Sequence, residues 1–244
     1  MFLIKLDAIG STNSFLKEYV KEHDAVNFTT VVAETQTQGR GQLGTEWASE
    51  HGKNLMFSVF VKNFIPNTQK IFDLNCIVTV SILHILQNYN LPDLFIKWPN
   101  DILSDNKKIV GILIENSIKT NGSIESIIGI GINVNQKNFE NLPKASSIYN
   151  LKGIFVDKDI LLNDILTEIM ANFNLYLTTG SDRFWTIFHD NLFKKNIPSL
   201  FLNEKTQQQF IATIKKVTEH GLLEIELEDK TIKNFGLKEI SIIY

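Results

Sequence analysis

Short apolar segments separated by polar residues run along most of the chain, and their spacing predicts strands and helices. A period of two places residues alternately on the two faces of a strand, whereas a spacing of three or four places them on one face of a helix. The pattern predicts an α+β fold, a mixed or antiparallel sheet with helices packed against it. Strands are expected near residues 2–6, 29–34, 54–61, 94–97, 108–116 and 124–134, and helices near 12–23, 69–89 and 158–179.

The pattern changes after a further helix near 181–190. Closely spaced short apolar segments follow, near 197–202, 210–214, 222–227 and 240–243. Several short strands at such spacing predict a small β-barrel of roughly fifty residues. We therefore expect two domains, residues 1–190 and 191–244, with a boundary near Asn191.

Composition narrows the class of protein. A chain of 244 residues with 43% hydrophobic content can bury one large core and a small satellite domain. The apolar N-terminus is broken by Lys5 and Asp7, and no uninterrupted apolar run reaches membrane-spanning length, so neither a signal peptide nor a membrane partner is expected. The net charge of -3 provides no basic surplus for nucleic acid. A cytoplasmic enzyme is expected.

Cysteine and histidine add no chemistry to this picture. The single Cys76 lies in an apolar segment, which excludes internal disulfides and predicts a role in core packing. The histidines are scattered without metal-ligand spacing, so no metal-binding residues are expected among them. They are His23, His51, His84, His189 and His220.

The run from Ile96 to Asp101, IKWPND, is the most informative segment. It places Lys97 at the end of an apolar strand and beside a rigid Trp-Pro corner, where an ammonium can be aimed at an anion. By alternation Phe95 and Lys97 share one face of that strand and Ile96 lies on the other. A hairpin turn with a solvated lysine is the alternative, and Asp101 is expected to accept backbone hydrogen bonds at the turn.

A second segment runs from Val31 through a loop with three glycines to Trp47. Glycines let backbone N–H groups approach a phosphate, and the guanidinium of Arg40 can bind one through a bidentate fork. An ordinary mobile surface loop is the alternative. No helix pattern follows, so a Rossmann site is not expected. Residues 38–47 are costly to order without a ligand, which predicts a loop that is mobile in the free protein and closes over a bound ligand.

Two further segments carry small or polar residues. Ser11, Thr12 and Asn13 precede a helical pattern, and helix capping accounts for at least one of them, while the others could hydrogen-bond a ligand. Gly129 and Gly131 lie two apart in an apolar strand and hence on one face. A bare strip of backbone on a strand usually means that a protein neighbour or a small molecule packs closely against it.

Together these segments, in this order and over nearly the whole chain, resemble the biotin protein ligases, in a short form without an N-terminal DNA-binding domain. The resemblance implies a class II synthetase-like biotin/lipoate ligase fold for the catalytic, biotin- and adenylate-binding domain, followed by an SH3-like β-barrel. It implies Lys97 and Arg40 as catalytic residues, and biotin contacts from Ser11, Thr12, Asn13, Gln36, Gly39, Arg40, Gly41, Lys97, Gly129 and Gly131. Adenylate contacts are implied for Arg40, Gly41, Gln42, Trp47, Lys97 and Asn133, although Trp47 could equally be a core residue that closes the loop.

The resemblance also implies the chemistry and the partners. Biotin would be activated with ATP and Mg²⁺ to biotinyl-5′-AMP and then transferred to a lysine of a biotin carboxyl carrier protein or domain of a biotin-dependent carboxylase. The enzyme could be a homodimer. The loop departs from many relatives, which carry further basic residues after the GRG, because this chain has Gln42, Leu43 and Thr45 there and Arg40 is the loop's only cation.

Three alternatives stand beside this interpretation. Lipoate ligases and octanoyl transferases share the fold, but the transferase uses a cysteine nucleophile, and Cys76 lies far from the motif loops in sequence. A lipoate ligase is disfavoured because the Ser-Thr-Asn triplet would have no partner on a dithiolane ring. A biotin-sensing repressor is disfavoured because the first motif begins at Ser11, which leaves no room for a helix-turn-helix module before it.

Overall fold

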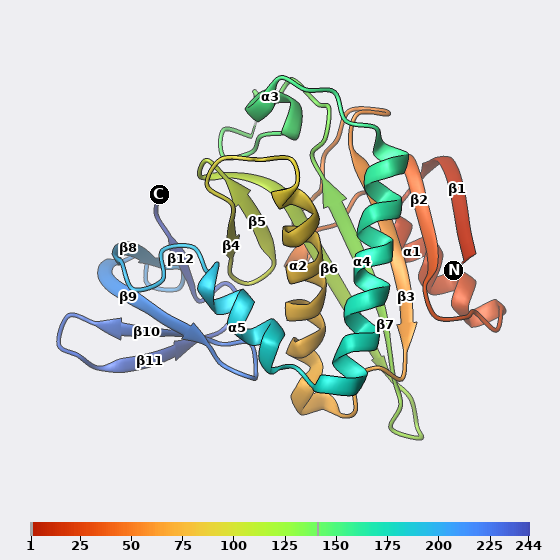
Figure 1. Ribbon diagram of the computed structural model, residues 1–244. Helices are drawn as coiled ribbons and strands as arrows, with labels where there is room; N and C mark the ends of the chain where they lie inside the picture. Colours follow the sequence, from red (N-terminus) through yellow and green to blue (C-terminus); the bar gives the residue numbers. More distant parts are fainter. Residues whose placement is uncertain (1, 141) are drawn as a thin grey trace.

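The computed structural model describes residues 2–140 and 142–244, and the side chain of Leu43 also lies outside the description. A mixed seven-stranded sheet forms its centre, in the order β1-β2-β3-β7-β6-β5-β4 (Figure 1). β1 and β2 run parallel and all other neighbours are antiparallel, which confirms the predicted mixed sheet. The strands are β1 (Phe2–Ile9), β2 (Thr29–Gln36), β3 (Leu55–Lys62), β4 (Phe95–Lys97), β5 (Asp101–Ser104), β6 (Lys107–Ile118) and β7 (Ile124–Ile132).

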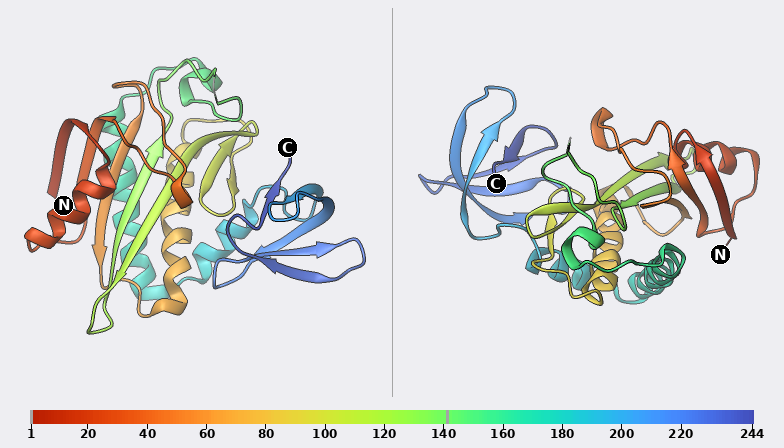
Figure 2. Two further views of the ribbon diagram at one scale, coloured as in Figure 1. Left: turned by 180° about the vertical axis from the view of Figure 1, so that it is seen from behind. Right: turned by 90° about the horizontal axis from the view of Figure 1, so that it is seen from above.

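Helices cover the two faces of this sheet unequally. The long helices α2 (Ile71–Gln87) and α4 (Lys158–Thr179) lie side by side on one face, and the short α1 (Thr12–Glu22) packs on the other (Figures 1 and 2). The alternation of β2 shows why, since Val32 joins the core under the long helices whereas Val31 joins the small cluster under α1. The rest of the second face is therefore available for a site.

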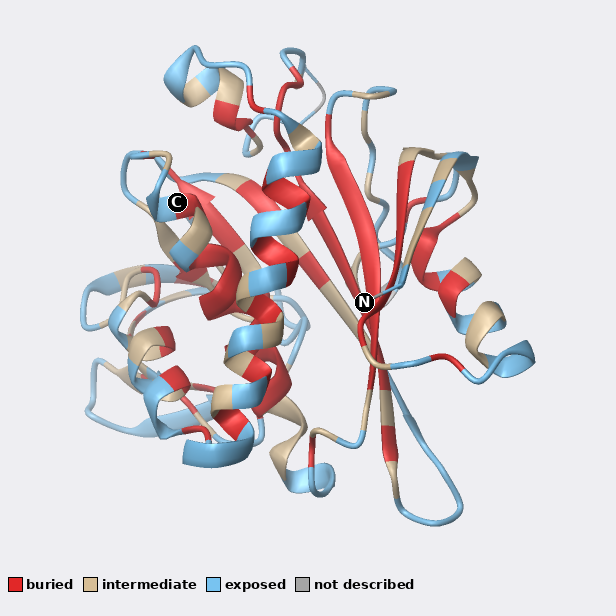
Figure 3. Cartoon of the chain, turned by 45° about the vertical axis from the view of Figure 1, so that its right-hand side comes forward, coloured by how far each residue is buried: buried red, intermediate tan, exposed pale blue. Residues whose placement is uncertain are grey.

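The helix α2 is apolar almost all round because it is enclosed. It packs against α4 and α5 (Asp182–Asp190), and most of its residues are buried, as the red helix behind α4 in Figure 3 illustrates. Together with the 3₁₀ turn before it, Thr68–Gln87, it is long and apolar enough to cross a membrane, with a mean hydropathy of 1.3. Within this segment, 67% of an 18-residue apolar stretch is buried inside the protein. Core packing therefore accounts for its apolarity.

The helix α4 shows the opposite pattern, with one buried and one exposed side (Figure 3). Its buried residues recur every three or four positions, from Leu161 to Tyr176. The Asp157 side chain caps its start by accepting hydrogen bonds from two backbone N–H groups, and Gly180 ends it with a φ of 76°.

The C-terminal part forms a second, antiparallel sheet in the order β11-β10-β9-β8-β12. This five-stranded sheet is consistent with the small β-barrel that the closely spaced segments predicted and with the SH3-like domain that the family resemblance implied. The boundary near Asn191 remains a prediction, although α5 ends at Asp190 and β8 begins at Pro198. The strands are β8 (Pro198–Asn203), β9 (Gln209–Val217), β10 (Leu223–Leu227), β11 (Ile232–Phe235) and β12 (Ile240–Ile242).

The segment between the two sheets pairs with the edge strand β4. The Ile96 N–H donates to the Asn191 carbonyl at 2.8 Å, and the Phe193 N–H donates to the Ile96 carbonyl at 2.8 Å. Trp98 reaches further and donates its indole N–H at 2.9 Å to the carbonyl of Gly221, in the turn that joins β9 and β10. The second sheet is therefore fastened directly to the strand that carries Lys97.

Two strands and one α-helix were absent from the sequence prediction: β5, β11 and α3 (Ile148–Lys152). Each is only a few residues long. β5 begins immediately after the Trp-Pro corner and carries a register irregularity between Ile102 and Leu103, so it offers no stretch of regular alternation. Ser147 caps α3 by accepting from the Asn150 N–H at 3.1 Å, a contact that a single serine does not reveal in sequence.

Candidate functional site

A cavity of about 590 Å³ opens on the sheet face opposite α2 and α4, and it extends to the second sheet. Its walls come from the start of α1, the ends of β2 and β4, the middle of β6 and β7, and the glycine loop after β2. Residues far apart in sequence thus share one space. The residues from the second sheet include Phe201, Leu223 and Ile240.

The start of α1 contributes a buried polar network. Thr12 donates from its N–H at 2.8 Å and from its hydroxyl at 3.1 Å to Oε1 of Gln36. Because that oxygen accepts both bonds, the amide nitrogen of Gln36 is turned the other way. Ser58 on β3 lies within hydrogen-bond distance of the Thr12 hydroxyl, at 2.8 Å, and of Oδ1 of Asn13, at 2.6 Å. These side chains hold one another in fixed rotamers.

Ser11 occupies the N-cap position of α1 but makes no side-chain capping bond. Its carbonyl accepts the first helical bond, from the Phe15 N–H at 3.0 Å. Capping by a side chain, which was expected to account for at least one residue of the triplet, is therefore not seen for Ser11. The buried Ser11 lines the cavity instead, as do Thr12 and Asn13.

Glycines in neighbouring strands form a flat floor. Gly111 on β6 and Gly131 on β7 are directly paired in register, and the ring of Trp47 lies on them. A Cβ at Gly131 would meet Cε2 of Trp47 at 2.5 Å, and a Cβ at Gly111 would meet its Cζ3 at 2.8 Å. Asn13 lies in the same way against Gly129. The neighbours of the bare strip are thus protein side chains, while both Gly129 and Gly131 also line the cavity.

The glycine loop folds back on itself as a narrow hairpin. The Gly41 N–H donates to the Thr45 carbonyl at 2.7 Å, and the Trp47 N–H donates to the Gly39 carbonyl at 3.0 Å. A side chain at Gly39 would collide with the Trp47 backbone, and one at Gly41 with the Thr45 hydroxyl. The hairpin thus requires glycine at position 39, whereas a side chain at position 41 would require the Thr45 hydroxyl to move. The hairpin also engages the Gly41 N–H, so this N–H does not face a bound anion in this conformation, whereas the Arg40 guanidinium lines the cavity.

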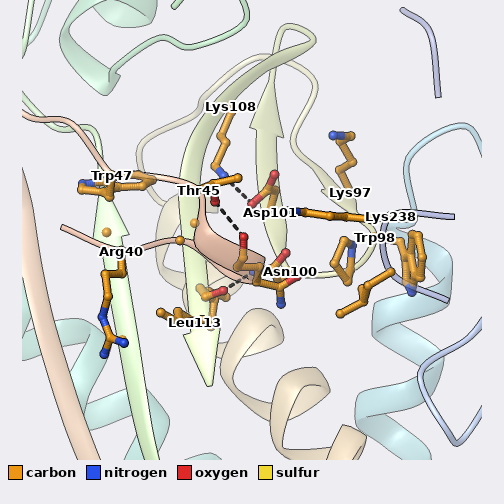
Figure 4. Close-up of a pocket in the computed structure, with 18 of the residues that line it drawn as sticks. Arg40, Thr45, Trp47, Lys97, Trp98, Asn100, Asp101, Lys108, Leu113 and Lys238 are labelled. Atoms are coloured by element: carbon orange, nitrogen blue, oxygen red, sulfur yellow. Dashed lines mark hydrogen bonds and ion pairs between the residues drawn. The ribbon is translucent and has the colours of Figure 1, made fainter. Parts of the chain in front are cut away.

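Lys97 is the last residue of β4 and lines the cavity on the side opposite Arg40 (Figure 4). Burial lowers the pKa of Lys97, and the ammonium groups of Lys108 and Lys144 lower it further, whereas Asp101 opposes them. The Lys97 Nζ lies 5.4 Å from the centroid of the Tyr244 ring. Asp101 was expected to accept backbone hydrogen bonds, but it pairs with the Lys108 ammonium at 2.7 Å, the ion pair drawn in Figure 4.

The Trp-Pro corner is held from two sides. Asn100 donates its side-chain amide to the Ile112 carbonyl, and its own carbonyl accepts from the Ile112 N–H at 3.1 Å. From α2, Asn75 donates to the Pro99 carbonyl at 2.7 Å. Lys97 therefore precedes a corner that is held by hydrogen bonds from β6 and α2. The alternative of a solvated lysine would instead require a free turn.

Most of the residues singled out from sequence come together, but not all of them. Gly39, a residue of the glycine loop, is buried and lines a second hollow rather than the main cavity. Asn133 is buried, donates to the Lys108 carbonyl at 3.4 Å and is not among the residues that line the cavity. The predicted site residues that do line it are Ser11, Thr12, Asn13, Gln36, Arg40, Gly41, Gln42, Trp47, Lys97, Gly129 and Gly131.

Sequence reasoning missed residues that complete the site. Ser58 is the one hydroxyl in the apolar strand β3, and Glu115 is a carboxylate at the end of the apolar run of β6, so both broke a pattern that could have drawn attention. Lys108 and Lys238 line the cavity with no motif to identify them.

A family model described as the biotin/lipoate A/B protein ligase family matches residues 6–133. The bifunctional ligase/repressor BirA of Bacillus spizizenii is 34% identical over 183 residues, which make up 73% of this chain and 55% of that protein. BirA of Escherichia coli is 26% identical over 241 residues, 97% of this chain and 73% of that protein. The chain thus spans about half the length of the first of these relatives.

Solved structures share the complete fold. The biotin protein ligase from Aquifex aeolicus in complex with biotin and ATP is similar with a TM-score of 0.79 and 28% identity. The similarity covers 99% of this chain and 98% of that one. Both the seven-stranded sheet and the C-terminal sheet therefore belong to the shared architecture.

Proposed function

The chain belongs to the biotin/lipoate A/B protein ligase family, and we propose that it is an ATP-dependent biotin protein ligase. It joins biotin to AMP with release of pyrophosphate, and it then transfers the biotinyl group to a lysine of a biotin carboxyl carrier domain. One observation carries this proposal: a buried polar network, Arg40 and Lys97 all line a single cavity.

The polar network suits the ureido head of biotin. That head offers a carbonyl and N–H groups, and Ser11, Thr12, Asn13 and Gln36 provide both donors and acceptors in a buried setting. A buried polar group left without its partner is costly, so such a pocket rejects analogues that lack the ureido. The dithiolane ring of lipoate has no group to match it, which disfavours the lipoate ligase alternative.

Adenylation brings an anionic carboxylate to an anionic α-phosphate. The repulsion is roughly 4 kcal/mol per charge pair at 4 Å and an effective dielectric of 20. Lys97 would neutralise this repulsion by bridging the biotin carboxylate and the α-phosphate, while Arg40, which lines the same cavity, would hold the phosphate. No covalent enzyme intermediate is required. In the second step the acceptor lysine attacks the mixed anhydride, and Lys97 stabilises the departing AMP.

Trp47 is assigned to the nucleotide side of the site. Its indole N–H is buried and has no hydrogen-bond partner among the described residues. Buried donors are usually satisfied, so a small shift of the ring that presents this N–H to an acceptor on a bound adenylate would satisfy it. The loop from Gln38 to Trp47 would close on that ligand and keep water from the mixed anhydride. Asn133 is proposed to face the adenine once the nucleotide is bound.

Magnesium would enter with ATP. Mg²⁺ is usually held by one or two carboxylates together with substrate phosphates, and it neutralises the departing pyrophosphate. Asp101 lines the cavity beside Lys97 and pairs with the Lys108 ammonium at 2.7 Å, so it would serve as such a donor only after exchanging that partner for an ion carried by the triphosphate. The other proposed properties are a cytoplasmic location, a carboxylase carrier domain as the protein partner, no binding of nucleic acid, and a possible homodimer.

The proposal is tested by incubating the purified chain with ATP, Mg²⁺ and either biotin or lipoate, and detecting the acyl adenylate by mass spectrometry. Biotinyl-AMP should form and lipoyl-AMP should not. Adding a purified biotin carboxyl carrier domain should then yield biotin on one lysine. Formation of lipoyl-AMP alone would identify the lipoate ligase alternative, and salt-sensitive retention of duplex DNA would point to the repressor alternative.

A further inference from the structure

Glu115 on β6 joins two parts of the site that the proposed mechanism treats separately. Its Oε2 accepts a hydrogen bond from Nδ2 of Asn13 at 2.8 Å and another from Nη2 of Arg40 at 3.0 Å. The two donors are on α1 and on the glycine loop, and both meet the same carboxylate oxygen. Nothing in the motif pattern assigned this residue a role.

Two acceptors set the orientation of the Asn13 amide, the Glu115 carboxylate at 2.8 Å and the Leu113 carbonyl at 3.4 Å. A carboxylate accepts hydrogen bonds and cannot donate them, so the NH₂ side of Asn13 must face Glu115. Oδ1 of Asn13 then faces Ser58, whose hydroxyl lies 2.6 Å away. The Asn13 side chain is buried and lies against Gly129, so it has little room to turn. Glu115 thereby helps decide which amide atoms remain for a ligand.

The contact with Arg40 orients a guanidinium that has donors to spare. Arginine carries five N–H donors in a planar fork, so one edge can bind Glu115 while another binds a phosphate. Arg40 lines both the cavity and the hollow beside the loop, and Glu115 lines the hollow. The guanidinium thus has the carboxylate on one side and the cavity within reach. The Glu115 side chain is 26% exposed and that of Arg40 is 45% exposed.

We propose that Glu115 is a positioning residue, which orients both the amide that reads the biotin head and the guanidinium that retains the adenylate. This inference rests on the proposed function, because it uses the roles given there to Asn13 and Arg40. It predicts that the two contacts can be separated by substitution. Gln at position 115 keeps an oxygen that accepts from Asn13, whereas it loses the charge that holds Arg40.

The experiment uses the purified full chain with Glu115→Gln, Glu115→Ala and a matched control. Glu125→Gln is that control, because Glu125 lies on the neighbouring strand β7, is 24% exposed and pairs with Lys119 at 2.8 Å. Biotin affinity is measured by calorimetry without ATP. Retention of the intermediate is measured as the release rate of radiolabelled biotinyl-AMP after a chase with unlabelled biotin.

Glu115→Gln should bind biotin within about twofold of the parent but release biotinyl-AMP about fivefold faster or more, since a neutral hydrogen bond is weaker than a charge-assisted one. Glu115→Ala should show faster release and also bind biotin about fivefold more weakly. Glu125→Gln should match the parent in both measurements. If Glu115→Ala proves unstable to heat, the nearly isosteric Gln variant decides the outcome.

A double variant separates positioning from general loosening of the fold. If Glu115 acts through Arg40, then Glu115→Gln should add less than about twofold to the release rate of Arg40→Gly. Effects that multiply, or a Glu115→Gln release rate equal to that of the control, would overturn the inference while the proposed function stands. A parent chain that forms no biotinyl-AMP would instead overturn the proposed function, and the inference with it.

Discussion

The charge on Lys97 is the strongest single requirement of the proposed mechanism, and Lys97→Ala removes it. The loss should be specific to catalysis. Burial lowers the pKa of Lys97, which means that the folded state disfavours the charged form. The folded chain therefore binds protons less readily than the unfolded chain as the pH approaches the lysine range, and removal of this ammonium withdraws no electrostatic stabilisation of the fold.

The magnitude follows from the charges that meet in the transition state. An ammonium about 4 Å from the reacting phosphate contributes roughly 4 kcal/mol at an effective dielectric of 20. Water that enters the space left by the side chain recovers part of this, so a net loss of about 3 kcal/mol remains, which is similar to the loss of one oxyanion donor. At 1.36 kcal/mol per factor of ten, adenylate formation should slow by roughly a hundredfold.

The assay is single-turnover formation of biotinyl-AMP, together with transfer from purified biotinyl-AMP to a carrier domain. Both steps should be slow in Lys97→Ala, and the urea midpoint should stay close to that of the parent. Lys62→Ala provides a matched control, because Lys62 ends β3 as Lys97 ends β4 but pairs with the exposed Asp24 away from the cavity. Adenylation within a few-fold of the parent would refute the role assigned to Lys97.

Three further substitutions test other parts of the site. Asp101 opposes the lowering of the pKa of Lys97, so Asp101→Asn should lower that pKa further. The alkaline limb of the pH profile for adenylation should then move to lower pH, and an unmoved limb would contradict this. Gly131→Ala should displace the Trp47 ring, because the added carbon would lie 2.5 Å from it. The free energy of unfolding measured in urea should fall by about 1–3 kcal/mol. Gly236→Ala is the control, and it should behave as the parent because the nearest atom to its added carbon lies 3.5 Å away. Arg40→Gly should release biotinyl-AMP faster and label lysines of bystander proteins, as detected with streptavidin, while its rate of adenylation falls less than that of Lys97→Ala. An unchanged release rate would remove the anchoring role of Arg40.

Local regularity decided how much of the fold was predictable. Strands such as β3 and β7 and helices such as α2 and α4 are long enough for their periods to be unambiguous, and they were placed within a few residues. The short β5, β11 and α3 depend on tertiary pairing or on a single cap, which a linear pattern does not contain. The same limit explains why the pairing of residues 191–193 with β4 was not foreseen.

The site was predictable where a motif is contiguous and unpredictable where contacts join distant strands. Ser11 to Asn13, Arg40 and Lys97 could be selected from short runs, and they line one cavity. Glu115 is 102 residues from Asn13 and 75 from Arg40, so its two contacts exist only after the sheet has formed. The prediction for the loop glycines was incomplete for a similar reason, because the hairpin that brings Gly41 against Thr45 is a folded feature.

The pairing of residues 191–193 with β4 has a consequence for solubility and for folding. An unpaired edge strand exposes N–H and C=O groups that can recruit another chain, and β4 avoids this because Ile96 bonds to Asn191 and Phe193 on its outer side. The covering segment is the same one that leads into the second sheet. A chain truncated after α5 should therefore lose more than a small domain, since it would expose an unpaired strand edge beside Lys97 and tend to aggregate as it folds.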